Sequence, residues 1–452
     1  MLDEAQWLLA AATRELTLFA GIGLLLGGID DLAIDLLWLA RLVWRRATVY
    51  RRHRRSTAAT LPPPERPGLI AVFVPAWREA DVIGTMLRSA LARFDHPLYR
   101  IYVGTYPNDP ATAAAVAAVA DPRVRMVGGT LPGPTTKAEC LNRLWTALLH
   151  DEREDGERAK AIVLHDAEDV VHPQELRVFD RLIERFDLVQ LPVLPLIDGR
   201  ARWVSGHYAD EFAEAHSRLL VVREALGAGI PSAGVGCALS RDALGRMAHH
   251  AEGLPFDETS LTEDYEIGVR IGGAGRAAFV AMRAAPGAGL VAVRAYFPDR
   301  FDTAVRQKTR WLIGIALAGW DRLRWDGGLA ERWMRLRDRR AFLAALILAT
   351  SYAVLALGAL CAAFDIAPVW PWWAGWLLAT NGLLLTWRLV VRFATVGYFY
   401  GWREGLRAVP RVIVANIIAM AAARRALIAY VPGKVPPWDK TAHVFPETLP
   451  CD

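Results

Sequence analysis

Two long apolar segments in the C-terminal third of the chain constrain its fold more than any other feature. Phe342–Phe364 and Ile366–Trp387 contain no acidic or basic residue. Each exceeds the roughly 20 residues that a helix needs to cross the hydrocarbon core of a bilayer. Asp365 and the prolines that follow it, beginning with Pro368, mark a turn between them. The pattern therefore predicts a transmembrane helical hairpin over residues 342–392.

A further apolar stretch near the N-terminus, Leu16–Trp44, carries acidic residues within it. Asp30, Asp31 and Asp35 interrupt the stretch, and carboxylates at such positions usually face a partner charge or a water-filled cavity. Because no small-residue cleavage site follows, the stretch is interpreted as a retained membrane helix rather than a signal peptide. The alternative is a hairpin that is broken at the aspartates and lies partly in the interface.

The last apolar stretch, Val409–Val431, contains Arg424 and Arg425, which favours an interfacial amphipathic helix over a span. Basic clusters at residues 45–55 and 332–340 flank the apolar segments. Clusters of this kind indicate the cytoplasmic side and contacts with anionic lipid. We therefore expect a multi-pass protein whose N-terminus is outside and whose central region is cytoplasmic.

The net charge of +5 also raises nucleic-acid binding as a rival explanation for the basic residues. No aromatic-basic interleaving or known nucleic-acid module accompanies them, so that class is set aside. The four cysteines are widely scattered, without a CxxC pair or a histidine-cysteine cluster. This distribution argues against a disulfide framework and against a structural zinc site.

The region between the membrane segments alternates short apolar runs with helical patterns. Such alternation predicts an α/β domain with a mostly parallel sheet and helices on both faces. The apolar runs are 68–75, 99–104, 124–129, 160–166 and 187–194, and helical patterns fill 80–94, 110–120, 138–150 and 173–185.

Polar side chains follow each of the first four predicted strands. Ligands of parallel sheets gather beyond the carboxyl ends of the strands, so we expect these side chains at one edge. They are Glu79, Asn108, Asp109, Lys137, Asp166, Glu168 and Asp169.

The sequence DAED at 166–169 places three carboxylates directly after a buried strand. Oxygen ligands of this kind suit Mg²⁺ or Mn²⁺, which bind carboxylates together with phosphate oxygens. A cation at this position would neutralise the charge on a departing nucleotide. The alternative is an acidic helix N-terminus that complements the helix dipole.

A second acidic pair, Glu263 and Asp264, stands before a helical pattern. A carboxylate here could take the proton from an attacking hydroxyl group, as general-base catalysis requires. The alternative is a helix start at which Thr262 is the capping residue.

The sequence RQKTRWLIG precedes the membrane hairpin. Gln307, Arg310 and Trp311 are three and four residues apart, so they share one helix face. Arginine can pair with a diphosphate, and tryptophan can stack on a sugar or a nucleobase. The alternative is an interfacial helix in which these residues are membrane anchors.

In this order the motifs make the chain resemble the processive family 2 glycosyltransferases. These are inverting enzymes of GT-A fold joined to membrane helices, such as cellulose and hyaluronan synthases. The likeness spans roughly residues 68 to 445 and rests on VPAWREADVI, TTKAECLN, DAED, TED and QKTRW, the last matching a QxxRW signature. Within the family the chain is similar to the inner-membrane phage-adsorption protein B group, which shares YPND, DAEDVVHP and a tail like PPWDKTAHVFP. That group often has a further C-terminal regulatory domain, which we expect this chain to lack.

The resemblance implies a role for each matching residue. Asp264 would be the general base, with Glu263 beside it. Asp166 and Glu168 would coordinate Mg²⁺ or Mn²⁺ on the donor diphosphate. The remaining residues would bind the nucleotide donor or close over it, the last three in a gating loop: Glu79, Lys137, Gln307, Arg310, Trp311, Trp438, Lys440 and Thr441.

Two departures from the family pattern affect these roles. A pair of aspartates usually follows the second strand and reads the base, whereas this chain has GTYPND. Asn108 or Asp109 is expected to substitute, which leaves uridine specificity open. The second position of the metal motif is Glu168 rather than aspartate, so Asp169 is an alternative ligand.

The resemblance implies an inverting hexosyltransferase of the bacterial inner membrane that moves sugar from a UDP-sugar or a similar donor onto an exopolysaccharide or surface glycan. Expected partners are the donor, a glycan or lipid acceptor, membrane lipids and an outer-membrane or periplasmic export partner, without nucleic acid. The alternatives to this function are single addition to a membrane lipid and an inactive assembly or phage-adsorption component.

The chain is predicted to divide into five parts. They are a membrane helix with its basic flank (1–55), the GT-A domain (56–300), an interfacial region (301–341), the hairpin (342–392), and an interfacial helix with a gating tail (393–452).

Overall fold

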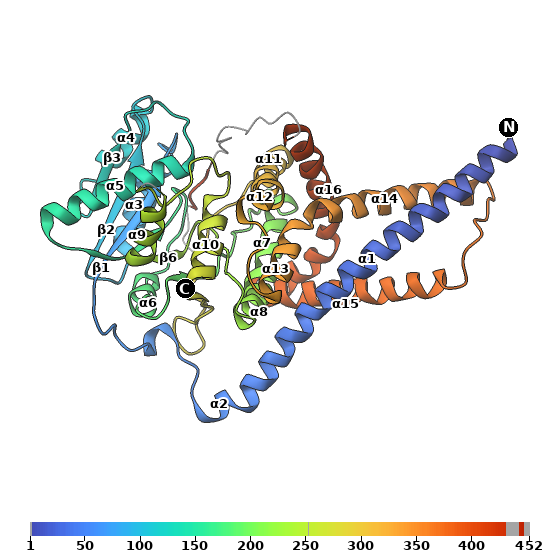
Figure 1. Ribbon diagram of the computed structural model, residues 1–452, viewed down its shortest axis with the longest axis horizontal. Coiled ribbons are helices and arrows are strands. Elements are labelled where there is room, and N and C mark those ends of the chain that lie inside the picture. The colour runs from blue at the N-terminus through green and yellow to red at the C-terminus, as the bar shows by residue number, and fades with distance from the viewer. Residues whose placement is uncertain (1, 252, 431–442, 447–452) are drawn as a thin grey trace.

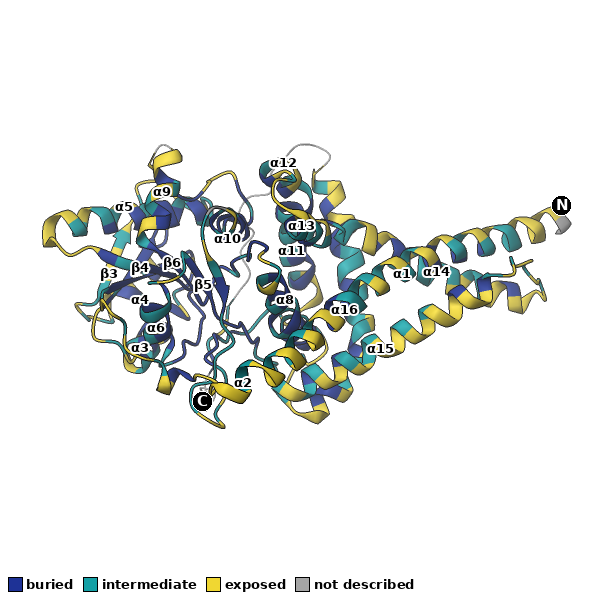
Figure 2. Cartoon of the chain, turned by 60° about the horizontal axis from the view of Figure 1, so that its bottom comes forward, coloured by how far each residue is buried: buried dark blue, intermediate teal, exposed yellow. Residues whose placement is uncertain are grey.

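The computed structural model describes residues 2–251, 253–430 and 443–446. Figure 1 shows an α/β domain from which long helices project to one side. In Figure 2 the sheet lies among buried residues, whereas the outer parts of the projecting helices are largely exposed. The predicted combination of a mostly parallel α/β domain with membrane-type helices is confirmed.

The sheet has seven strands in the order β3-β2-β1-β4-β6-β5-β7. Six strands run in one direction and β6 runs against them, paired antiparallel to both β4 and β5. The sequence did not predict β6 and β7, which have only four and three residues. The strands are β1 Leu69–Pro75, β2 Tyr99–Thr105, β3 Val124–Gly128, β4 Ala159–Leu164, β5 Leu188–Gln190, β6 Cys237–Ser240 and β7 Ala277–Phe279.

Strand β1 is buried along its whole length, so both of its faces are apolar. Ile70, Val72 and Val74 belong to one core cluster, and Ala71 and Phe73 belong to a second on the other face. This alternation follows from the two-residue period of a strand. The helices that cover the first face are α3 Ile83–Arg93, α4 Pro110–Ala117 and α6 Glu175–Leu182, and those that cover the second are α5 Lys137–Asp155, α9 Arg241–His250 and α10 Glu263–Ala274.

A second group of helices joins the domain to the projecting helices. Two of its segments, Ala215–Leu219 and Leu312–Ala318, are π-helical. Single π-helical turns of this kind are rare and are often found at functional sites. The α-helices of the group are α7 Val204–Glu214, α8 Leu220–Ala225, α11 Phe301–Trp311, α12 Gly319–Leu323 and α13 Leu329–Arg339.

Four helices within the described residues are long and apolar enough to cross a membrane. The first, α1, is one continuous helix of 46 residues, so the broken-hairpin alternative is wrong. Its axis is about 69 Å long at 1.5 Å per residue, more than twice the thickness of the hydrocarbon core. The four are α1 Leu2–Ala47, α14 Ala341–Ala363, α15 Ala374–Tyr400 and α16 Trp402–Tyr430.

The predicted hairpin is present as α14 and α15, but its second helix starts later than expected. It begins at Ala374 rather than at Ile366. Pro368 and Pro371 explain the difference, because proline disfavours helical conformation in the residue before it and lacks the amide hydrogen of a helix interior. In this connection Trp372 is 87% exposed.

Helix α16 lies where the projecting helices meet the domain (Figure 1). Its Arg411 is fully buried and makes two bonds, of 2.8 and 2.6 Å, to the carboxylate of Asp210 on α7. Gly206 on α7 has no side chain, and a Cβ there would collide with the Arg411 guanidinium. The length and composition of α16 permit a crossing, so its interfacial placement stays a prediction.

The three aspartates of α1 all bind basic residues, as the sequence predicted. Asp35 lies 2.5 Å from Arg218, and Asp31 lies 2.8 Å from Arg337. Asp30 accepts hydrogen bonds from Arg337 and Arg340. Asp31 and Asp35 border a small cavity of about 150 Å³ between α1, α7, α13 and α15. We call its charged lining the boundary cluster: Asp31, Asp35, Glu211, Glu214, Arg218, Arg337, Arg388 and Arg392.

Candidate active site

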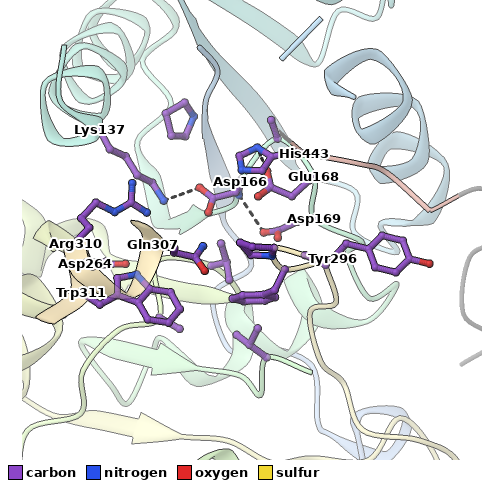
Figure 3. Close-up of a pocket in the computed structure, with 18 of the residues that line it drawn as sticks. Lys137, Asp166, Glu168, Asp169, Asp264, Tyr296, Gln307, Arg310, Trp311 and His443 are labelled. Atoms are coloured by element: carbon purple, nitrogen blue, oxygen red, sulfur yellow. Dashed lines mark hydrogen bonds and ion pairs between the residues drawn. The ribbon is translucent and has the colours of Figure 1, made fainter. Parts of the chain in front are cut away.

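A larger cavity of about 590 Å³ opens at the carboxyl ends of β1 and β4. It lies between the sheet, the first turn of α10 and one face of α11, and Figure 3 shows the side chains that point into it. Most sequence-predicted site residues meet here. They are Glu79, Lys137, Asp166, Glu168, Asp169, Glu263, Asp264, Gln307, Arg310 and Trp311.

Asp166 is paired with a lysine from the start of α5. Lys137 Nζ donates to Asp166 Oδ1 at 2.6 Å. Burial alone would lower the pKa of Lys137, but the nearby carboxylates of Asp166, Glu263 and Asp264 together raise it above its ordinary value. Lys137 is therefore a fixed positive charge in the cavity.

Glu168 meets a histidine that the sequence did not single out. His443 Nδ1 lies 3.2 Å from Glu168 Oε2 and 2.9 Å from Glu79 Oε1. Burial raises the pKa of Glu168 to about 8 against the opposing effect of His443. Burial would lower the pKa of His443, but Glu168 and Glu79 raise it to about 9.

Glu79, Glu168 and His443 each offer a ligand atom, and these atoms lie within 4.8 Å of one another. Glu168 Oε2 is buried and accepts no hydrogen bond from the described residues. Carboxylate oxygens suit Mn²⁺ or Mg²⁺, and the imidazole of His443 adds a nitrogen ligand of the kind that other divalent transition metals prefer. The residues present therefore fit a divalent cation. His443 stands within the tail motif PPWDKTAHVFP, but its spacing does not indicate that it reaches Glu79 and Glu168.

Asp169 has different hydrogen-bond partners from Asp166 and Glu168. His165 Nδ1 lies 2.8 Å from Asp169 Oδ2, and that oxygen also accepts the backbone N–H of Asp166 at 3.0 Å. The four residues 166–169 form a turn, and α6 begins only at Glu175. The alternative of an acidic helix N-terminus is therefore wrong for this motif.

The acidic pair Glu263 and Asp264 occupies the first turn of α10. Burial raises the pKa of both carboxyls, that of Glu263 to about 7. Thr262 holds the N-cap position, but its side chain makes no capping bond. Gly234 has a φ of 74°, and a Cβ at this position would collide with Asp264 Oδ2. The backbone is thus shaped to admit Asp264.

Gln307, Arg310 and Trp311 share the face of α11 that lines the cavity (Figure 3). Trp311 is in ring contact with an aromatic cluster rather than exposed at a membrane surface. This placement speaks against ordinary membrane anchors. The ring centroids of Tyr208, Phe212 and Phe297 lie 6.1, 6.4 and 6.5 Å from that of Trp311.

Asn108 and Asp109 do not line the cavity. Asn108 donates to the carbonyl of Gly133 and accepts its N–H, both at 2.7 Å. Asp109 caps α4 and accepts the N–H of Arg78 at 2.6 Å. In this structure both residues hold loops at the ends of β1 and β3, so their expected base contact stays a prediction.

The gating-loop residues Trp438, Lys440 and Thr441 lie outside the described residues. The segment that follows them is described, and His443, Val444, Phe445 and Pro446 line the cavity wall. Phe445 also packs against the core cluster that contains Ile70. The end of the described chain therefore completes the site.

Comparison with known proteins gives one family match and two curated relatives. The family model described as glycosyltransferase like family 2 matches residues 67–314. Bacteriophage adsorption protein B of Escherichia coli K12 and bacteriophage N4 adsorption protein B of Escherichia coli O157:H7 are each 37% identical to the chain over 484 residues. Each alignment covers 98% of this chain and 63% of the relative, so the chain spans less than two thirds of these curated relatives.

One solved structure shares the fold over nearly its whole length. It is the mannosyltransferase PcManGT from Pyrobaculum calidifontis, solved in complex with GDP-Man and Mn²⁺. The TM-score is 0.52 at 19% identity, and the match covers 89% of this chain and 99% of that one. At this identity the likeness shows the fold alone.

Proposed function

Because the chain belongs to glycosyltransferase family 2, we propose that it transfers a hexose from a nucleotide-diphosphate donor, in the first instance a UDP-sugar, to an acceptor hydroxyl with inversion. One observation carries the proposal. A single cavity gathers the DAED carboxylates, the buried pair Glu263 and Asp264, and the Gln307, Arg310 and Trp311 face of α11.

Asp264 is proposed as the general base. Its raised pKa keeps the carboxylate basic enough to take the proton from the acceptor hydroxyl. In a single in-line displacement the acceptor oxygen forms a bond to the anomeric carbon. The bond from that carbon to the diphosphate oxygen breaks on the opposite side, which inverts the configuration.

The remaining residues are proposed to bind the donor. Lys137 and Arg310 supply positive charge for the diphosphate, and Trp311 offers an aromatic face for a sugar ring. Asp166 and Glu168, joined by Glu79 or His443, would hold Mn²⁺ or Mg²⁺. Such an ion stabilises the negative charge on the leaving diphosphate when it is bound.

The acceptor is proposed to be a growing exopolysaccharide or another surface glycan, with export across the inner membrane. The basic residues at 45–55 and 332–340 support a cytoplasmic catalytic domain. The names of the two relatives support a second candidate, an inner-membrane component of phage adsorption. The same fold would then recruit a partner instead of catalysing transfer.

The test is nucleotide release by the purified protein in detergent, with Mn²⁺ or Mg²⁺ and a panel of nucleotide sugars. Asp264→Asn is compared with Asp242→Asn, which removes an exposed carboxylate on α9. We expect release from one donor that is lost in Asp264→Asn and kept in Asp242→Asn. Silence across the panel, with no donor binding, would reject the enzyme in favour of the adsorption component.

A further inference from the structure

His165 is a buried histidine directly before the DAED motif, and it has no role in the proposed function. Its side chain is fully buried between two carboxylates. Nδ1 lies 2.8 Å from Asp169 Oδ2, and Nε2 lies 2.6 Å from Glu175 Oε1. Asp169 is 2% exposed and Glu175 is not exposed at all, so this three-residue chain is closed to solvent.

Each ring nitrogen of His165 has a carboxyl oxygen within hydrogen-bond distance, so the ring is held at both ends. It contacts one carboxyl group of the motif from behind the cavity.

The three carboxylates of the motif thus have three different basic partners. Lys137 and His443 reach Asp166 and Glu168 from inside the cavity. The partner of Asp169 does not line the cavity. Of the three carboxylates, Asp169 is the one held from the protein interior.

The same contacts fix the backbone of the motif. Asp169 Oδ2 accepts the N–H of Asp166 at 3.0 Å, and the N–H of Asp169 donates to the carbonyl of Asp166 at 3.2 Å. Glu175 Oε2 accepts the N–H of His172 at 3.1 Å. His165 therefore ties the turn at the end of β4 to the start of α6.

We infer that His165 is a positioning residue for the cation site. It holds Asp169 as an anchor of the turn, so that Asp166 and Glu168, and not Asp169, present their oxygens to the metal. The inference rests on the metal binding in the proposed function. It divides the acidic motif into two ligands and one structural carboxylate.

The experiment measures Mn²⁺ binding directly, from the loss of the free-ion electron paramagnetic resonance signal, with the full chain in detergent and without donor. His165→Gln keeps a polar side chain but removes the ring whose two nitrogens contact Asp169 and Glu175. We expect Mn²⁺ to bind at least about 10-fold more weakly, as for other groups that orient metal ligands. Unchanged binding in a folded variant would overturn the inference.

Asp169→Asn gives an independent test that does not depend on the histidine variant folding. Its side-chain oxygen can still accept the N–H of Asp166, so Mn²⁺ affinity should stay close to that of the wild type. Asp166→Asn should abolish binding. If Asp169→Asn loses Mn²⁺ as Asp166→Asn does, Asp169 is a ligand and the inference is wrong.

His96→Gln is the matched control. His96 Nε2 lies 3.0 Å from Asp180 Oδ2, with a 5% exposed side chain, but neither residue lines the cavity. We expect this variant to lower the unfolding temperature without changing Mn²⁺ affinity. An equal loss of Mn²⁺ affinity in His96→Gln would show that the His165→Gln effect comes from lost stability in general, and would overturn the inference.

Wild-type protein that does not bind Mn²⁺ overturns the inference as well. Protein that binds Mn²⁺ but releases no nucleotide rejects only the proposed function.

Discussion

The boundary cluster and the active-site cavity bury acidic residues in opposite ways. Around the boundary cavity, four carboxylates face four guanidinium groups, and Glu214 lies 2.6 Å from Arg392 and 2.8 Å from Arg388. Burial would raise the pKa of Glu214, but these arginines hold it below its ordinary value. In the active-site cavity eight carboxylates face four basic side chains, and burial raises the pKa of Glu168 to about 8.

The charges of the boundary cluster stabilise the fold, whereas the surplus carboxylates of the active-site cavity are available to bind a ligand. A matched buried cluster has its partners within the fold, and removal of one partner leaves a buried charge uncompensated. A site with surplus carboxylates lowers its own electrostatic energy when a cation enters. Variants in the first region should therefore change stability, and variants in the second should change binding and rate.

The largest expected effect is on the rate. Asp264→Asn removes the proposed base and should lower kcat at least about 1000-fold, within the range of general-base contributions. The unfolding temperature should not fall, because the variant removes a carboxylate with a raised pKa. Paired turnover and thermal-unfolding measurements check this. If Asp264→Asn lowers the unfolding temperature as well as kcat, active-site carboxylates also stabilise the fold and the proposed difference between the two regions is wrong.

Asp35→Asn tests the boundary cluster from the membrane side. Asp35 and Arg218 are each 6% exposed and lie 2.5 Å apart, so the variant leaves a buried guanidinium with less compensation. We expect a loss of about 3 kcal/mol in the free energy of unfolding. Mn²⁺ affinity should be unchanged when the protein is folded. Denaturant titration in mild detergent measures the free energy of unfolding. If Asp35→Asn is as stable as the wild type, the boundary cluster does not have the stabilising role given to it.

The pH dependence should reveal the raised pKa of Asp264. Burial is its cause, and only the deprotonated carboxylate accepts a proton, so kcat should fall as pH falls through that value. The expected slope is about tenfold per pH unit on the acid side, beginning above the ordinary pKa of aspartate. Lys137 lowers the pKa of Asp264, so Lys137→Met should move this limb to higher pH. If the acid side of the kcat profile stays at the same pH in Lys137→Met, Lys137 does not control the pKa of Asp264.

The smallest effect is expected for a surface pair. Arg158 and Asp242 lie 2.5 Å apart, but their side chains are 61% and 67% exposed. Asp242→Asn should change the free energy of unfolding by no more than about 0.5 kcal/mol. Calibration against this pair shows how much of the Asp35→Asn effect comes from burial. Equal losses in the two variants would remove the distinction.

The sequence predicted the part of the fold that depends on local pattern. The run Leu69–Pro75 is apolar throughout because both faces of β1 are covered, and this run predicts a central parallel strand. The strands β6 and β7 are too short to carry a periodic signal. Their pairing depends on contacts with β4 and β5 that only the folded chain brings together.

The candidate site divides in a similar way. Asp166 and Asp264 follow recognisable motifs, so their positions could be predicted. The histidine partners of Asp169 and Glu168 could not be predicted, because the contacts of His165 and His443 depend on three-dimensional proximity. Asn108 was predicted at the correct edge of the sheet, but its side chain binds Gly133 instead of facing the cavity.

The wall formed by residues 443–446 has a consequence for synthesis of the protein. His443 meets Glu79, yet 363 residues separate them, and α14, α15 and α16 lie in that interval. A ribosome releases Glu79 early and His443 only after all three helices have been made. The α/β domain can therefore fold on the nascent chain with its cavity still open. Because His443 is made after α14, α15 and α16, the cavity wall that it forms can be completed only when those helices have been synthesised.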